Sequence, residues 1–169
     1  ILKGCVDDIW LAISSLLIVF PFLAGRLGFL GISFTGGIGV LAMACEKRIA
    51  RAHFNVPTFG HHRIRLRNAT WGSGHSVQNF FSQKPRMTLK TLRYYDAANA
   101  AETLSMPVHF ALALQDPVVT PPGQFAIYNH TVSEKQLFVL EQGHSDDYRN
   151  KTQQEKLLLE ELEEFFESL

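Results

Sequence analysis

Apolar residues along this chain alternate between short runs of strand length and longer stretches with helical spacing. Strand-like runs lie at residues 26–31, 50–57, 106–115 and 136–140, and helical stretches are predicted at 6–19, 36–46 and 152–169. The run at 106–115 is apolar on both faces, which is typical of a parallel strand covered by helices on both sides. Strands that alternate with helices predict an α/β fold, with a parallel sheet flanked by helices.

The polar segment at about 60–92 interrupts this alternation with histidines, arginines, glycines and a proline. We interpret it as an excursion of short helices and loops, lying over the carboxyl ends of the strands, where ligands bind in such sheets. We expect residues 1–169 to form a single domain that includes this excursion. Four strands are few for a sheet covered on both faces. Either the fold is small, or the chain is the second half of a larger one.

Residues 9–23 are apolar enough to raise the question of a membrane span. Ser14, Ser15 and Pro21 interrupt the stretch, and it is shorter than the roughly 20 residues that a spanning helix needs. Asp7 and Asp8 stand where a signal peptide would have basic residues. We therefore predict a helix that covers one face of the sheet, and then a loop. A protein anchored in a membrane by this stretch is the alternative.

Composition narrows the choice of function. The 169 residues are 46% hydrophobic and 19% charged, with 16 basic and 16 acidic side chains. No net charge attracts nucleic acid or an anionic membrane, so we expect neither as a partner, and we expect a cytoplasmic location. Cys5 and Cys45 have no metal-ligand spacing, and we predict buried thiols rather than a disulfide.

The turn after the first strand carries the first candidate for chemistry. Gly31-Ile32-Ser33-Phe34-Thr35 follows a strand and opens a helix, as in a nucleophile elbow with the pattern Gly-x-Ser-x-Gly. Thr35 stands where the last glycine is expected, and Gly36 and Gly37 follow it. Ser33 is therefore either a nucleophile or an ordinary turn serine, and the choice depends on its partners.

An acid and a base follow in the order that an elbow serine requires. Asp116 ends the apolar run, where a carboxylate can be fixed and pointed at a histidine; the alternative is a turn or helix-capping aspartate. Gly143 and His144 follow the last strand, and a histidine there can take the serine proton and return it to a leaving group. Ser33, Asp116 and His144 together favour a hydrolase.

The other histidines have weaker settings. His53 and His109 lie within strands and are expected in the core, and His130 follows a helix and is expected at the surface. His61, His62 and His75 lie in the excursion, where contact with substrate is possible. No pair of histidines has the carboxylates or cysteines of a metal site, so we predict no metal and no cofactor.

Six separated motifs resemble the acetyl xylan esterase and cephalosporin C deacetylase family in order and spacing. They are the elbow with Gly36-Gly37-Ile38-Gly39, Leu92-Arg93-Tyr94-Tyr95-Asp96, Asp116-Pro117, Pro121-Pro122, Phe125-Ala126-Ile127-Tyr128-Asn129 and Gly143-His144. The resemblance runs from about Gly4 to the carboxyl end and implies an α/β-hydrolase fold. It also implies a serine esterase that removes acetyl groups from xylo-oligosaccharides, other acetylated sugars or small esters.

On this resemblance, Ser33 is the nucleophile, His144 the base and Asp116 its partner. The backbone N–H of Phe34 is one oxyanion-hole donor, and such donors contribute about 10²–10³ in rate. Members of the family tend to assemble as oligomers, which predicts a homo-oligomer here.

Three departures from the family pattern qualify these expectations. Thr35 is expected to strain the elbow, residues 19–23 are unusually apolar, and the first half of the fold, with the second oxyanion donor, is absent. A sheet without those strands is expected to expose a long edge and an apolar face. We therefore expect a fragment, a truncated product or one piece of an assembly. The alternative function is a non-catalytic homologue that acts as a structural or binding subunit.

Overall fold

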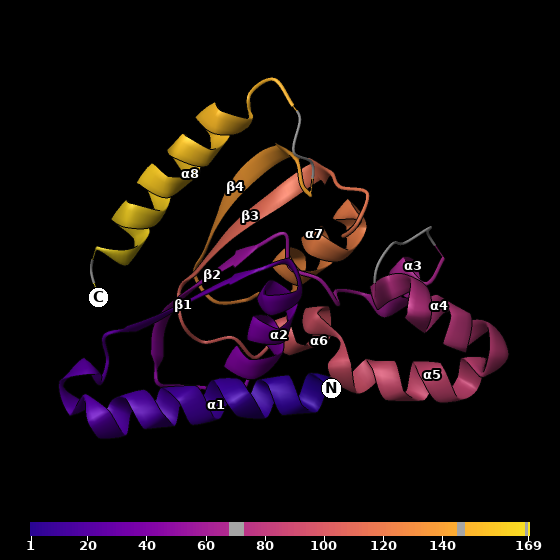
Figure 1. Cartoon of the computed structure of the whole chain (residues 1–169), viewed down its shortest axis with the longest axis horizontal. Helices are drawn as coiled ribbons and strands as arrows, with labels where there is room; N and C mark the ends of the chain where they lie inside the picture. The colour runs from indigo at the N-terminus through magenta and orange to yellow at the C-terminus, as the bar shows by residue number, and fades with distance from the viewer. Residues whose placement is uncertain (68–72, 145–147, 168) are drawn as a thin grey trace.

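Four parallel strands form the centre of the fold. The computed structural model describes residues 1–67, 73–144, 148–167 and 169 (Figure 1). In it, β1 (Leu27–Ile32), β2 (Ile49–Asn55), β3 (Val108–Gln115) and β4 (Lys135–Gln142) lie side by side in the order of the sequence. Because all the pairs are parallel, the carboxyl ends of the strands meet at one edge of the sheet. The predicted α/β class with a parallel sheet is confirmed.

Helices cover both faces of this sheet. On one face lie α1 (Leu2–Val19), α2 (Ser33–Met43), α6 (Ala97–Ala101) and α7 (Pro121–His130), and on the other lies α8 (Lys151–Phe166) (Figure 1). Successive residues of a strand point to opposite faces. Accordingly Phe110 and Leu112 join the core under α2 and α7, whereas Ala111 and Ala113 pack with Leu158 of α8. The six buried residues that begin β3 explain its apolar character.

Boundaries differ from the sequence expectations mainly at element ends. The first helix begins at Leu2 instead of residue 6, and the short 3-10 helix η1 (Pro21–Leu23) occupies part of the predicted loop. The helix predicted at 36–46 begins earlier, at Ser33 itself. One burial prediction was wrong: Cys45 lies in the turn after α2 and is exposed, and Cys5 is half-buried. The two cysteines are free thiols.

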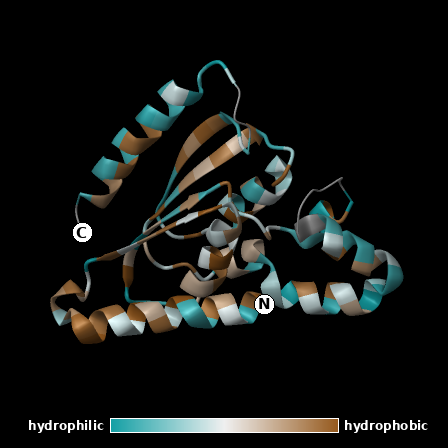
Figure 2. Cartoon of the chain, in the orientation of Figure 1, coloured by the Kyte–Doolittle hydropathy of each residue, from teal (hydrophilic) through white to brown (hydrophobic). Residues whose placement is uncertain are grey.

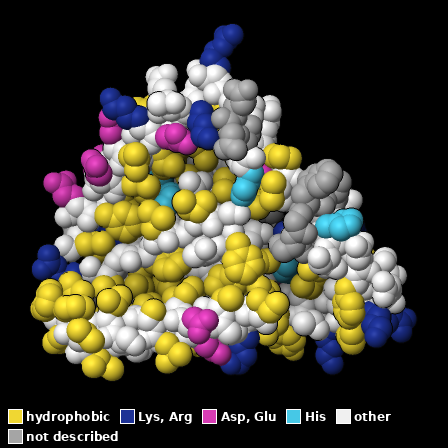
Figure 3. Space-filling model, viewed as in Figure 1, with side chains coloured by type: hydrophobic (Ala, Val, Ile, Leu, Met, Phe, Trp, Pro, Cys, Tyr) yellow, Lys and Arg dark blue, Asp and Glu magenta, His cyan; other side chains and the backbone are white. Residues whose placement is uncertain are grey.

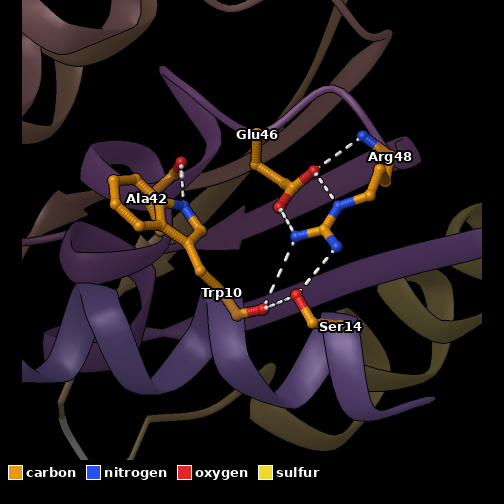
Figure 4. A network of polar contacts seen from close by, with 5 residues as sticks. All are labelled: Trp10, Ser14, Ala42, Glu46 and Arg48. Atoms are coloured by element: carbon orange, nitrogen blue, oxygen red, sulfur yellow. Dashed lines mark hydrogen bonds and ion pairs between the residues drawn. The ribbon is translucent and has the colours of Figure 1, made fainter. Parts of the chain in front are cut away.

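Helix α1 is tied to the loop between α2 and β2 by a polar network (Figure 4). The Trp10 indole N–H donates to the Ala42 carbonyl over 3.0 Å. Arg48 donates to both carboxylate oxygens of Glu46, at 2.8 and 2.6 Å, and to the Ser14 hydroxyl at 2.9 Å. Glu46 is only 4% exposed, so its charge needs these donors to remain buried. The network fixes the helix against the face that it covers.

The excursion consists of α3 (His62–Arg65), α4 (Ser73–Gln83), α5 (Pro85–Leu92) and the 3-10 helix η2 (Arg93–Tyr95), which extend to one side of the sheet (Figure 1). Asp96 anchors both of its ends. Its Oδ1 accepts from the backbone N–H groups of His61 and Ala98, and its Oδ2 accepts from that of His62. One half-buried carboxylate thereby holds the start of the excursion beside its return to the sheet.

Apolar side chains remain uncovered along β1 and α1. In the described residues β1 pairs only with β2, and Leu30 and Ile32 are each 52% exposed. Ile18 and Phe22 are 80% and 70% exposed, in the strongly apolar end of α1 and the turn after it (Figure 2). Figure 3 shows hydrophobic side chains gathered on this face of the molecule, over the end of α1 and across the sheet above it. The exposed edge and apolar face match the sequence expectation. None of the helices within the described ranges is long and apolar enough to cross a membrane.

Candidate active site

Ser33 lies on a tight turn from β1 into α2, at the carboxyl edge of the sheet. Its φ of +55° is in the left-handed region, which a residue with a side chain rarely adopts. A backbone hydrogen bond stabilises the turn, because the Thr58 N–H donates to the Ser33 carbonyl over 3.1 Å. A strained strand-to-helix turn that presents a serine hydroxyl is the geometry of a nucleophile elbow.

The turn brings backbone segments close together, and Gly31 and Gly36 allow this because they have no side chain. A Cβ on Gly31 would lie 2.8 Å from the Thr35 carbonyl oxygen, and one on Gly36 would lie 3.2 Å from the Pro57 Cα. Thr35 itself is exposed and is not among the residues with positive φ. The strain expected at Thr35 is therefore not found, because the close approach falls one residue later in the helix.

Asp116 follows β3 and is buried, with 6% of its surface exposed. Its Oδ1 accepts hydrogen bonds from the backbone N–H groups of Val118 and Val119, at 2.8 and 2.9 Å. Its Oδ2 points away from this turn and accepts from His144. The sequence left two roles open for this aspartate, a turn residue and a partner for histidine. One oxygen makes the contacts of the first role, and the other makes the contact of the second.

His144 joins the acid to the serine. Its Nδ1 lies 2.7 Å from Asp116 Oδ2, and its Nε2 lies 2.7 Å from Ser33 Oγ. An ionised carboxylate only accepts, so Nδ1 carries the proton and the unprotonated Nε2 accepts from the Ser33 hydroxyl. Gly143 permits this approach, since a Cβ there would overlap Asp116 Oδ2. Ser145, which the sequence places next, lies outside the described residues.

Gln124 also contacts Asp116, and sequence reasoning did not find it. This α7 side chain is fully buried. Its Oε1 accepts from the Ala113 N–H at 2.9 Å, and its Nε2 donates to Asp116 Oδ2 at 3.2 Å and to the Val119 carbonyl at 2.5 Å. The available signal was its spacing: Gln124 and Ile127 are three residues apart, so the glutamine lies on the buried face of a helix. A buried amide there needs partners, and the aspartate turn supplies them.

The backbone N–H of Phe34 lies in the first turn of α2, where N–H groups have no acceptor within the helix. The Phe34 side chain is 40% exposed and packs edge-on against Phe59, with 5.4 Å between ring centroids. These two rings line an apolar cavity of about 230 Å³, together with Leu66 and Val77 of the excursion. A second cavity, of about 260 Å³, is lined by His144 together with Asn55 and Tyr148.

His53 and His109 are buried, as predicted, and contact each other across β2 and β3. Their Nδ1 atoms are 2.9 Å apart, and His109 Nε2 lies 3.4 Å from Glu161 Oε2 of α8. Since the carboxylate can only accept, His109 carries its proton on Nε2 and His53 donates from Nδ1. Burial and the neighbouring His109 lower the pKa of His53 to about 3. Burial also lowers the pKa of His109.

The remaining histidines lie away from Ser33. His62 is buried, its Nε2 is 2.9 Å from the Tyr95 carbonyl, and burial lowers its pKa. His61 has a φ of +49° and accepts from the Ile64 N–H, and His75 lies exposed on α4. His130 is partly exposed and pairs with Glu102 over 2.8 Å, close to the surface position expected. Contact of the excursion histidines with substrate stays a prediction.

Comparison with known proteins decides the family. The acetyl xylan esterase family model (AXE1) matches residues 15–161. This chain belongs to the acetyl xylan esterase family. The resemblance carried by the sequence motifs is thereby confirmed, and the matched residues include both Ser33 and His144.

Solved structures show how much of the family fold this chain covers. The acetyl xylan esterase from Paenibacillus sp. R4 is 24% identical with a TM-score of 0.73, and the match covers 86% of this chain and 46% of that one. For acetyl xylan esterase 1 from Thermoanaerobacterium sp. JW/SL YS485 the values are 21%, 0.64, 78% and 44%. The Pyrococcus horikoshii acylaminoacyl peptidase, 15% identical, reaches a TM-score of 0.77 over 96% of this chain and 27% of its own.

These similarities confirm the α/β-hydrolase fold. The chain spans less than half the length of both acetyl xylan esterases that it matches.

Proposed function

We propose that this acetyl xylan esterase family chain carries the catalytic residues of a serine esterase that removes acetyl groups from acetylated sugars or related small esters. Ser33 is the nucleophile, His144 the general base and acid, and Asp116 the residue that orients His144. The observation that carries the proposal is the continuous hydrogen-bond chain Ser33–His144–Asp116, with two contacts of 2.7 Å.

Each step of the reaction uses a group already oriented for it. Ser33 Oγ attacks the acetyl carbonyl carbon while its proton passes to His144 Nε2. The resulting imidazolium is stabilised by the carboxylate of Asp116, which holds the proton on Nδ1. His144 then returns the proton to the departing sugar oxygen, and water, activated in the same way, releases acetate from the serine.

The charge that develops on the carbonyl oxygen needs donors of its own. The Phe34 N–H is our candidate for one of them, since a free N–H at the start of a helix favours negative charge. A second donor is expected from outside the described residues. The apolar cavity beside Phe34 is of a size and polarity that suits a small acyl group.

The test is covalent labelling combined with turnover. A fluorophosphonate probe is expected to label Ser33, and Ser33→Ala is expected to abolish both labelling and hydrolysis of 4-nitrophenyl acetate. Ser82→Ala, which changes an exposed serine on α4, is the matched control and is expected to retain both. Unchanged turnover in Ser33→Ala would refute the assignment.

The proposal also covers the domain organisation and the oligomeric state of the protein. We propose that residues 1–169 form a single partial domain with the excursion at 60–92, and that the protein assembles as a homo-oligomer. Light scattering on the purified chain measures its assembly state. Absence of both labelling and turnover in the folded chain would instead favour the non-catalytic subunit.

A further inference from the structure

A third cavity lies between the excursion and the helices α6 and α7, and three cationic side chains line it. Its volume is about 370 Å³, and Arg63, Lys90 and Arg93 contribute to its walls together with Asn99 and Asp96. The three cations come from three different elements, α3, α5 and η2. The tertiary structure therefore gathers positive charges that the sequence keeps up to 30 positions apart.

The acids near this cavity are already occupied. Both oxygens of Asp96 accept from backbone N–H groups, those of His61, His62 and Ala98, at 2.9 to 3.0 Å. Glu102 does not line the cavity, and it pairs over 2.8 Å with His130, which does.

In the described part of the chain, no carboxylate lies within ion-pair distance of Arg63, Lys90 or Arg93. Three positive charges and one carboxylate, itself held by backbone donors, leave the cavity with an excess of positive charge. An ordinary solvated surface would disperse such charges, whereas here they line one concave space.

We propose that this cavity is a binding site for an oxyanion, either a carboxylate or a phosphate carried by a small molecule. A guanidinium presents paired N–H donors whose geometry matches two oxygens of a carboxylate or phosphate, and a lysine adds a point charge. Because Arg63, Lys90 and Arg93 are exposed, water and salt screen the attraction. Affinity is expected in the millimolar range at low salt and is expected to fall as salt rises.

This site is a neighbour of the candidate active site and is separate from it. The anion cavity and the apolar cavity share His62 and Leu92 in their walls, and only the apolar cavity includes Phe34. Ser33, Asp116 and His144 line neither of them. Binding at the cationic cavity is therefore measurable without ester hydrolysis, and it stands or falls independently of the proposed function.

The experiment is isothermal titration calorimetry on the whole chain at low ionic strength. The probes are inorganic phosphate, glucuronate and, as the uncharged counterpart of glucuronate, glucose. Arg63→Gln and Arg93→Gln each remove one cation from an exposed position, and each is expected to weaken binding about tenfold, the effect of losing one charge-assisted hydrogen bond. Arg86→Gln is the matched control, because Arg86 is exposed on α5 but lies outside the cavity lining.

The outcomes separate the possible sources of the anion. Saturable binding of glucuronate but not glucose, weakened about tenfold in both variants, supports a site for an acidic sugar. Binding of phosphate alone, weakened to the same extent in both variants, supports a phosphate site. If neither anion binds, or if Arg86→Gln weakens binding as much as Arg63→Gln and Arg93→Gln do, the site does not exist.

Discussion

The hydrogen bond from Gln124 to Asp116 supports a prediction about how a buried residue outside the proposed triad positions the acid. Gln124 joins the β3 backbone, the turn after it and the carboxylate that contacts His144, through three hydrogen bonds. We therefore expect Gln124→Glu to disturb Asp116 while keeping the shape of the side chain. The glutamate cannot donate to the Val119 carbonyl or to Asp116 Oδ2 when it is ionised, and it places a second negative charge beside the first.

The size of the effect follows from these contacts. A hydrogen bond to a charged group contributes about 1.5–3 kcal/mol, so its loss corresponds to a decrease of roughly 10- to 100-fold in kcat for 4-nitrophenyl acetate. KM should change little, because the side chain is buried behind the acid and does not reach the substrate. The decrease should be smaller than that of Asp116→Asn, for which the loss of the orienting acid costs about 10⁴ in a comparable triad.

Two measurements separate positioning from simple loss of structure. The added negative charge stabilises the charged imidazolium of His144, so the acidic limb of the kcat–pH profile should move to higher pH. Gln124→Leu, which adds no charge, should lower kcat without that movement. Gln153→Glu makes the same chemical change on the exposed side of α8 and should leave the profile unchanged. Wild-type kcat and an unmoved profile in folded Gln124→Glu would refute the reasoning.

Three further predictions follow from buried charge and from the elbow. The folded-state pKa of His53, about 3, lies below the ordinary value of 6.5, so its contribution to stability is present above pH 6.5 and is lost as the pH falls. The free energy of unfolding measured in urea should therefore decrease by about 2 kcal/mol between pH 7 and pH 5. His53→Phe should flatten that pH dependence. Arg48→Met removes the donors that lower the pKa of the buried Glu46 carboxyl, and should lower Tm by several degrees; an unchanged Tm would show that the network in Figure 4 does not hold α1 in place. Thr35→Gly restores the usual elbow pattern at an exposed position, and should leave turnover within about twofold of wild type, whereas a large gain would mean that the threonine does strain the turn.

Much of the fold was predictable because it depends on local pattern. The continuous apolar run at β3 indicated a strand covered on both faces, and six buried residues confirm it. Element ends were less accurate: nothing in the sequence of the apolar stretch at 9–23 indicated that its helix begins at Leu2. The burial of Cys45 was mispredicted because helical spacing was extended past the end of α2, into a turn that faces solvent.

The candidate site also has residues that the sequence predicted and residues that it did not. Ser33, Asp116 and His144 could be chosen from the sequence because each follows a strand, and the carboxyl ends of parallel strands meet at one edge. The role of Gln124 could not, because its importance lies in contacts with β3 and with the turn after it. Thr35 was expected to strain the elbow because the pattern assigns crowding to a sequence position, whereas the actual approach of backbones is at Gly31 and Gly36.

The sequence by itself determined the alternation of strands and helices, the family and the three residues proposed for catalysis, since periodicity and motif order are properties of the chain alone. Only the tertiary structure decided that both oxygens of Asp116 have separate partners and that Arg63, Lys90 and Arg93 face one cavity. It also decided that His53 and His109 are hydrogen-bonded to each other in the core. The physical reason is that hydrogen bonding, desolvation and charge balance depend on distances of a few ångströms between groups that lie far apart in the sequence.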